Sequence, residues 1–261
     1  SEQGTDLNGD ADTDDDLISF YSISKGEAVV TGVVGWLGWD SFEGSTIAFT
    51  TSEGQANVDL NYDGDKDDSV IRYYDLSSGA VTNTGLIGES PCLSRGIIAF
   101  STSEAQSGID LNDDGDTEDY VFRYYNTSSS MVTNTRVAGL LGSLDGDILA
   151  FDRWVDERRR IEIGCYELSS GTVTWVAVGG EPSLDDNIIA FSLWEQWFDR
   201  DLNKDGDAID SLMGYFVIGV DQPIELQWQR DLGWGLILMV TIALLVAIVL
   251  LYSLKLRKSL L

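Results

Sequence analysis

Four short acidic loops carry the residues of this chain that are best suited to chemistry. We number them loop 1 (residues 6–15), loop 2 (59–68), loop 3 (110–119) and loop 4 (201–210), and all fit the pattern D-L-N-x-D-[GA]-D-x-x-D. Carboxylate and amide side chains alternate at positions 1, 3 and 5, and the small residue at position 6 permits a sharp turn. Ca²⁺ takes about six to eight oxygen ligands of this kind. The pattern therefore predicts four calcium sites.

The predicted calcium ligands occupy positions 1, 3, 5, 7 and 10 of each loop. They are Asp6, Asn8, Asp10, Asp12 and Asp15 in loop 1; Asp59, Asn61, Asp63, Asp65 and Asp68 in loop 2; Asp110, Asn112, Asp114, Asp116 and Asp119 in loop 3; and Asp201, Asn203, Asp205, Asp207 and Asp210 in loop 4. Position 7 is expected to offer a side-chain or a backbone oxygen. The leucine at position 2 is expected to pack inward and fix the loop; it is Leu7, Leu60, Leu111 and Leu202.

An EF-hand is excluded for these loops, because it needs a bidentate glutamate at position 12. Leucine or valine stands at that position in all four loops. We therefore expect each loop to join two strands. The loops resemble the D-x-[DN]-x-D-G-x-x-D loops of integrin-type propellers and of dockerins, although the closing aspartate here stands at position 10 instead of 9. Without metal the carboxylates of one loop would repel one another, so we expect the role of calcium to be structural.

The net charge of −28 is concentrated in these loops, which together with the adjoining Asp16 hold 21 of the 44 acidic residues. The alternative is that they are solvated acidic turns of a salt-adapted protein. Outside the loops and Asp16, 23 acidic residues face 14 basic ones, which is an ordinary surface, so the local pattern favours ligands. The overall acidity argues against nucleic acid as a partner, because nucleic acid is bound through its phosphates.

The residue types argue against an enzyme. The chain has no histidine, which removes the usual proton shuttle, the Ser-His and Cys-His pairs and histidine-ligated zinc. Paired carboxylates could hydrolyse glycosides, but no pair outside the loops stands out. The two cysteines, Cys92 and Cys165, lack the spacing of a zinc site, and either one disulfide or two buried thiols would be consistent with the sequence.

The loops belong to an internal repeat whose starts are 53, 51 and 91 residues apart. The last spacing is close to two periods, and the unit at about residues 140–180 has RWVDERRR, from Arg153 to Arg160, in place of a loop. Apolar runs such as STIAFTTSE and GIIAFSTSE precede the loops, and alternating runs such as SVIRYYDLSSG follow them. With a lead-in and a closing strand, each complete unit offers four antiparallel strands. Four antiparallel strands in a repeat of this length are typical of a propeller blade.

The repeat resembles the TolB-type β-propeller in SPCLSRGIIAF, YYDLSSGAVTNT and CYELSSGTVTWV. The resemblance implies an all-β fold with blades at residues 38–87, 88–138, 139–179 and 180–230, and a half-blade at 1–37. A half-blade leaves a strand edge unpaired, so we expect preceding sequence or another chain to supply the missing strands. An open array of five units is the alternative. The tryptophans are expected to pack between blades more often than to stack on sugars.

Residues 232–254 carry no charge and are long enough for a transmembrane helix. Lys255, Arg257 and Lys258 follow, which predicts a cytoplasmic tail at 255–261 and an extracellular domain at 1–230 on one helix at 231–254. The predicted function is a calcium-binding cell-surface propeller that acts by binding, adhesion or scaffolding toward a protein or glycan partner. It resembles prokaryotic, and in particular archaeal, envelope proteins. One alternative is a noncatalytic subunit of a membrane complex. The other is a carbohydrate-active propeller enzyme.

Overall fold

The computed structural model describes residues 4–140, 142–155 and 160–219. Its elements are strands with two single-turn α-helices and one 3-10 turn among them. The strands are β1 (Leu17–Ser22), β2 (Glu27–Val34), β3 (Phe42–Glu43), β4 (Thr46–Ser52), β5 (Ser69–Asp75), β6 (Ala80–Ile87), β7 (Glu89–Ser94), β8 (Ile97–Ser103), β9 (Tyr120–Asn126), β10 (Met131–Ala138), β11 (Gly142–Asp145), β12 (Ile148–Val155), β13 (Arg160–Glu167), β14 (Thr172–Val178), β15 (Gly180–Asp185), β16 (Ile188–Trp194) and β17 (Ser211–Val217). The turns are α1 (Glu53–Ala56), α2 (Glu104–Ser107) and η2 (Glu195–Trp197).

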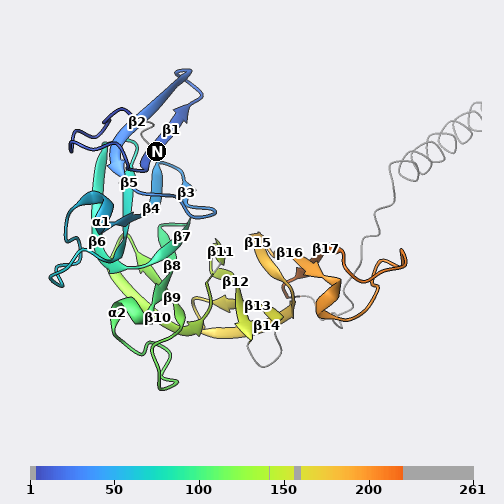
Figure 1. Cartoon of the computed structure of the whole chain (residues 1–261). Helices are drawn as coiled ribbons and strands as arrows, with labels where there is room; N and C mark the ends of the chain where they lie inside the picture. The colour runs from blue at the N-terminus through green and yellow to red at the C-terminus, as the bar shows by residue number, and fades with distance from the viewer. Residues whose placement is uncertain (1–3, 141, 156–159, 220–261) are drawn as a thin grey trace, which may run out of the picture.

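The strands form five antiparallel sheets in chain order, which we call sheets 1 to 5. Sheet 1 is β1-β2, sheets 2, 3 and 4 are β3-β4-β5-β6, β7-β8-β9-β10 and β11-β12-β13-β14, and sheet 5 is β15-β16-β17. Figure 1 shows them following one another along an arc, with the first strand of sheets 3, 4 and 5 toward its inner side. Contacts between β4 and β7, β7 and β11, and β11 and β15 join the sheets. The prediction of an all-β fold with four-stranded antiparallel units is confirmed.

The core consists of layers between neighbouring sheets. Isoleucine, alanine and phenylalanine of the second strands suit a buried sheet position, and the four phenylalanines at the end of the I-[IL]-A-F-type motif are almost fully buried: Phe49, Phe100, Phe151 and Phe191. Each belongs to an apolar cluster that also contains side chains of an adjacent sheet. Burying one such ring contributes about 1.5–3 kcal/mol. The repeated motif therefore sets both the strand and the packing between sheets.

Within the described residues, β1 pairs only with β2. The missing strands that we expect preceding sequence or another chain to supply remain a prediction. The predicted transmembrane helix lies outside the described residues. In the part of the chain that is described, no helix is long and apolar enough to cross a membrane. Cys92 and Cys165 are both buried and free, which decides between the two alternatives in favour of buried thiols.

Candidate metal sites

Loops 2, 3 and 4 each leave the second strand of a sheet through a single helical turn. In sheet 2 this turn is α1, where the Ser52 side chain accepts a hydrogen bond from the backbone N–H of Gln55. Asn57 ends the turn in the left-handed conformation, with φ of 50°. Loop 2 then leads back into β5, as loop 3 leads into β9 and loop 4 into β17. Each loop therefore joins the second and third strands of one sheet, as expected.

A buried glutamate opens each of these turns and holds both ends of the loop. Glu53 is fully buried. Its Oε1 accepts the backbone N–H of Leu60 at 2.5 Å and of Asn61 at 3.1 Å, and its Oε2 accepts the N–H of Asp68 at 3.4 Å. Hydrogen bonds to a charged carboxylate contribute about 1.5–3 kcal/mol each. Glu53 therefore fixes the start and the end of loop 2 against the sheet.

Loops 3 and 4 repeat this arrangement. Glu104 accepts the N–H groups of Leu111 at 2.5 Å, Asn112 at 3.2 Å and Asp119 at 3.3 Å. In loop 4, Glu195 accepts the N–H groups of Leu202 at 2.6 Å, Asn203 at 3.1 Å and Asp210 at 3.2 Å. Both glutamates are fully buried. A buried glutamate therefore supports loops 2, 3 and 4 in the same way.

The sequence reasoning missed these glutamates, although a signal for them exists. Glu53, Glu104 and Glu195 each stand six residues before position 1 of their loop, at the end of the apolar run of the second strand. The corresponding position for loop 1 lies before Ser1 of the printed sequence. In the unit without a loop the aligned residue is Val155. The complete pattern is thus a glutamate, five residues and then the ten-residue loop.

The first aspartate of each loop organises the backbone. In loop 2, Asp59 accepts the N–H of Tyr62 at 2.6 Å and of Gly64 at 3.2 Å on its two oxygens. Gly64 has φ of 107°, a left-handed value at which only glycine is free of strain. Asp63 then accepts the N–H of Asp65 at 3.2 Å. These hydrogen bonds wind the loop so that its later carboxylates come together.

The asparagine at position 3 lies between two carboxylates. Asn61 Nδ2 donates to Asp68 Oδ2 at 2.7 Å and to Asp63 Oδ2 at 3.1 Å, while its Oδ1 accepts the N–H of Asp63 at 3.1 Å. The amide nitrogen therefore faces the carboxylates here, and a role as ligand requires the amide to turn over. The alternation of residue types predicted this residue at the site but could not predict which amide atom points inward.

Carboxylate oxygens converge in all four loops. The oxygens of Glu53, Asp65 and Asp68 lie within 4.8 Å of one another, and such groups could hold a metal ion. The same holds for three further groups: Asp10, Asp12 and Asp15; Glu104, Asp116 and Asp119; Glu195, Asp207 and Asp210. The structure thus brings together positions 7 and 10 with the buried glutamate, or with position 5 in loop 1. Position 1 shapes the backbone, and position 5 of loops 2 to 4 is joined to the group through the asparagine.

The closing aspartates have perturbed acidities. Burial, followed by the neighbouring Asp63 and Glu53 carboxylates, raises the pKa of Asp68 to about 6. Burial also raises the pKa of Asp119 in loop 3. By contrast, the backbone N–H of Asp65 lowers the pKa of Asp63. Packed carboxylates that oppose each other's ionisation are the environment that a divalent cation would neutralise.

The leucine at position 2 is buried in loops 2 and 3, half-buried in loop 4, where it is Leu202, and exposed in loop 1. Leu60 and Leu111 are 8% and 9% exposed, as predicted, whereas Leu7 is 50% exposed and the prediction for it is wrong. The described residues contain no strands of sheet 1 other than β1 and β2, so Leu7 has less protein to pack against. In sheets 2 and 3 an asparagine of the fourth strand also holds the loop: Asn83 and Asn134 donate to the carbonyls of Leu60 at 2.7 Å and Leu111 at 2.8 Å.

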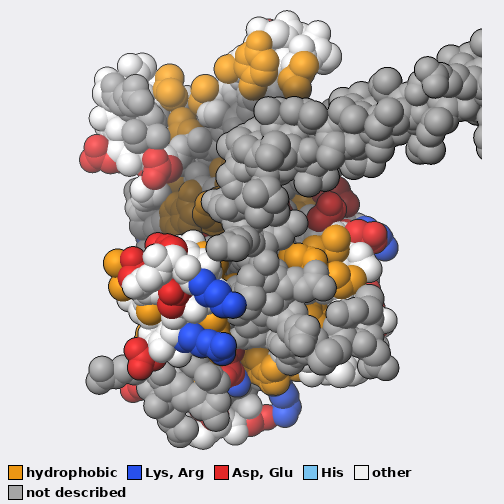
Figure 2. Space-filling model, turned by 90° about the vertical axis from the view of Figure 1, so that its right-hand side faces the viewer, with side chains coloured by type: hydrophobic (Ala, Val, Ile, Leu, Met, Phe, Trp, Pro, Cys, Tyr) orange, Lys and Arg blue, Asp and Glu red, His pale blue; other side chains and the backbone are white. Residues whose placement is uncertain are grey.

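Sheet 4 lacks the loop and its supports. Val155 takes the place of the glutamate, and Trp175 takes the place that Asn134 has in sheet 3. Arg153, the first residue of RWVDERRR, lies over the Trp175 ring at 3.7 Å and pairs with Glu162 at 3.3 Å. Residues 156–159, with Arg158 and Arg159, lie outside the described residues. On the face drawn in Figure 2, acidic side chains form several separate groups, with hydrophobic and basic side chains between them.

Comparison with known proteins identifies the fold only. No family model and no curated protein matches the chain. TolB from Acinetobacter baumannii is a similar solved structure, with a TM-score of 0.50 and 16% identity over 78% of this chain and 47% of that one. A prolyl endopeptidase structure has a TM-score of 0.50 and 10% identity over 83% of this chain and 33% of that one. The β-propeller domain of the Trilobed protease from Pyrococcus furiosus has a TM-score of 0.46 and 10% identity over 69% of this chain and 53% of that one.

The similarities to TolB and to the prolyl endopeptidase, both with a TM-score of 0.50, support the β-propeller fold. The chain spans about half the length of the TolB structure and a third of the prolyl endopeptidase. Propellers serve enzymes and non-enzymes alike, so the function has to be argued from the loops.

Proposed function

We propose that this chain is a calcium-binding β-propeller that works at the cell surface by binding or scaffolding, with calcium in a structural role. The observation that carries the proposal is the threefold arrangement of a buried glutamate with two converging loop aspartates, repeated in part by loop 1. Its donors are all oxygens, which suits a hard cation. Loops 1 to 4 would hold one ion each.

Calcium suits these loops better than zinc or magnesium. The chain has no histidine, and both cysteines are buried in the apolar clusters, away from the loops. Each loop offers five oxygen-bearing side chains on a glycine-containing turn, and Ca²⁺ accepts such numerous and irregular ligands more readily than Mg²⁺ does. When bound, the ion would supply the positive charge that the converging carboxylates need.

The remaining parts of the proposal come from the sequence. The uncharged run at 232–254 followed by basic residues supports a single membrane helix, a cytoplasmic tail and an extracellular propeller. The absence of histidine supports a binding function over catalysis. A protein or glycan is the partner that this location favours.

Calorimetric titration of the full chain in detergent, after removal of metal, tests the proposal. We expect about four calcium ions to bind, and a melting temperature that falls in chelator. Magnesium at the same concentration serves as the control and should restore less stability. A folded sample that binds no calcium would refute the proposal.

The proposed extracellular location of the propeller has a separate test. Protease added to intact cells should degrade the propeller while the basic tail stays protected. Protection of the propeller would contradict the proposed orientation.

A further inference from the structure

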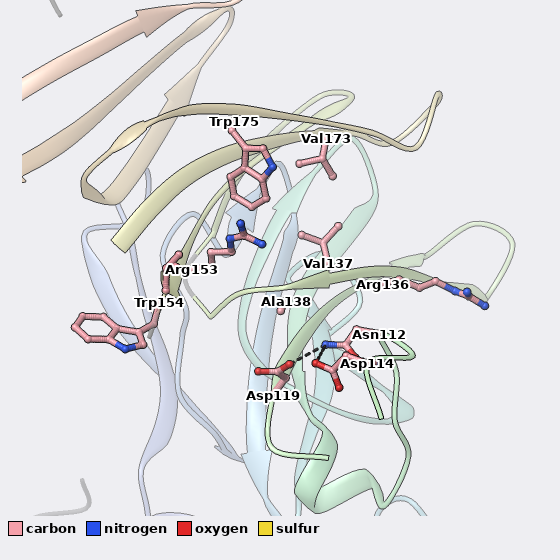
Figure 3. A pocket seen from close by; sticks show the side chains of 11 residues that line it. Asn112, Asp114, Asp119, Arg136, Val137, Ala138, Arg153, Trp154, Val173 and Trp175 are labelled. Atoms are coloured by element: carbon pink, nitrogen blue, oxygen red, sulfur yellow. Dashed lines mark hydrogen bonds between the residues drawn. The ribbon is translucent and has the colours of Figure 1, made fainter. Parts of the chain in front are cut away.

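A cavity of about 630 Å³ lies between sheets 3 and 4, beside loop 3. Figure 3 shows Asn112, Asp114 and Asp119 on one side of it and the Arg153 guanidinium under Trp175 on the other. Binding pockets for small molecules have about 300–1,000 Å³. A second cavity of about 310 Å³ also contains Asp119 and Arg153, so these two side chains stand where the two cavities meet.

The basic and acidic sides of the cavity do not pair with each other. Among the described residues, the ion pair of Arg153 is with Glu162, at 3.3 Å, and it uses only Nη2. The buried Nε of Arg153 is without a hydrogen-bond partner. A guanidinium has five N–H donors in a planar fork, so Arg153 keeps donors for a carboxylate. Trp175 holds one face of the guanidinium at 3.7 Å from its ring centre.

The two remaining sides of the cavity differ in character. Val137 and Val173 provide an aliphatic wall, whereas Asn112, Asp114 and Asp119 provide hydrogen-bond acceptors. A sugar ring has an apolar C–H face and a rim of hydroxyl donors, and a sugar acid adds one carboxylate. These three features match the valines, the acceptors of loop 3 and Arg153.

We propose that the cavity between sheets 3 and 4 binds an acidic sugar unit, with its carboxylate on Arg153 and its hydroxyl groups toward loop 3. This inference rests on the proposed function, because a calcium ion in loop 3 neutralises the carboxylates that face the ligand and offers a further contact to hydroxyl oxygens. An acidic peptide would also bring a carboxylate to Arg153. It lacks the hydroxyl groups that the acceptors of loop 3 would receive.

Arg153 differs from the residues at the same place in the two preceding sheets. The aligned residue is Thr51 in sheet 2 and Thr102 in sheet 3, and each threonine donates to a carbonyl of the preceding sheet, at 2.7 and 2.8 Å. Arg153 instead pairs with Glu162 of its own sheet, and its guanidinium lines the cavity beside loop 3. The interface between sheets 1 and 2 has a separate cavity of about 660 Å³, which neither Thr51 nor an acidic loop lines.

Titration of the calcium-loaded full chain in detergent with glucuronate tests the proposal, with tryptophan fluorescence and calorimetry as readouts. Glucose is the neutral control, and a tetrapeptide of aspartate and glutamate is the acidic control. Arg153→Gln should weaken glucuronate binding at least about tenfold, because a charged hydrogen bond is removed. Arg95→Gln is the matched control and should have no effect, since Arg95 is an exposed arginine of sheet 3 that lines neither cavity.

Each outcome decides for or against the acidic sugar. Saturable binding of glucuronate that is at least tenfold tighter than that of glucose and is lost in Arg153→Gln supports it. Normal calcium binding with no glucuronate binding, with equal binding to Arg153→Gln, or with binding of the tetrapeptide alone overturns it and leaves the proposed function standing. Failure of calcium binding in the first titration refutes the proposed function instead. Should Arg153→Gln not fold, Arg153→Lys, which removes the Nε donor, replaces it in the same comparison.

Discussion

Sheets 3 and 4 have the same strand order and equally buried cores, yet only sheet 3 carries an acidic loop. Phe100 and Phe151 hold the same place in the two sheets and are both fully buried. The two sheets diverge toward the end of the second strand, where Thr102 and Glu104 are replaced by Arg153 and Val155. A blade of this chain therefore folds around its phenylalanine whether or not a loop is present. The glutamate serves the loop and not the sheet.

Two further positions differ between sheets 3 and 4. Arg123 and Asn134 are register partners in sheet 3, and their counterparts in sheet 4 are Gly164 and Trp175. A Cβ on Gly164 would lie 2.6 Å from the Phe151 ring, so glycine makes room for Trp175 to pack against that ring at 5.6 Å between centroids. Glycine at this place is not restricted to the sheet without a loop, because Gly214 of sheet 5 occupies it beside loop 4. Trp175 in place of an asparagine gives sheet 4 an aromatic side chain at the cavity.

The largest expected difference between the two sheets follows removal of calcium. Chelation should lower the melting temperature of the full chain by at least about 10 °C, because each site occupied at a hundred times its Kd contributes about 2.7 kcal/mol. Hydrogen exchange should show amides of loop 3 losing protection while those of β12 and β13 keep theirs. Equal loss of protection in both sheets would show that calcium supports the whole propeller and not its loops.

Glu104→Gln should produce the next largest effect. The substitution removes the charge and turns an amide NH₂ toward backbone N–H groups that Glu104 now accepts, which costs about 1–3 kcal/mol for a buried unpaired donor. We expect one calcium ion fewer in calorimetry and a lower melting temperature. Glu118→Gln is the matched control, because Glu118 is an exposed acid of the same loop outside the converging group. An unchanged number of ions in Glu104→Gln would remove the glutamate from the site.

The sequence was sufficient for the repeat, the strands and the acidic groups. Period, alternation and the I-A-F motif are local patterns, and the structure follows them closely from β3 to β17. The sequence was also sufficient to identify the buried glutamates, because Glu53, Glu104 and Glu195 stand at a fixed distance from their loops. They were missed because a glutamate that ends an apolar strand is ordinarily expected to be exposed to solvent. Its role depends on a loop that folds back onto it.

Other features depend on contacts between sheets that no local pattern contains. Leu7 has the same neighbours in sequence as Leu60, yet it is exposed because burial depends on the surrounding sheet. The orientation of the Asn61 amide is set by the Asp63 backbone and the Asp68 carboxylate together. The cavity beside Arg153 is lined by side chains of sheets 3 and 4 together. Such features become visible only when the repeats are compared in space.

Lowering the pH from 7 to 5 should weaken the calcium affinity of loop 2 by about tenfold. The pKa of Asp68 without metal is about 6, so at pH 5 a proton must leave before calcium binds. The stability of the chain changes with pH in opposite directions with and without metal. Because the pKa is raised on folding, the metal-free chain loses stability as pH rises through 6, whereas the calcium-loaded chain gains it. Calorimetry in buffers of different ionisation enthalpy should detect proton release at pH 5.5, and an affinity independent of pH would contradict this assignment.

The smallest effect concerns the residue at position 6. Loop 1 has Ala11 there with φ of 83°, whereas loop 3 has Gly115 with φ of 104°. A left-handed conformation costs a non-glycine residue about 1–2 kcal/mol, part of which glycine loses again through its greater freedom in the unfolded chain. Ala11→Gly should therefore strengthen calcium binding at loop 1 by several-fold, and Gly115→Ala should weaken loop 3 by a similar factor. Titration of the two variants side by side measures both, and an equal shift in the same direction would show that the turn at position 6 does not control the site.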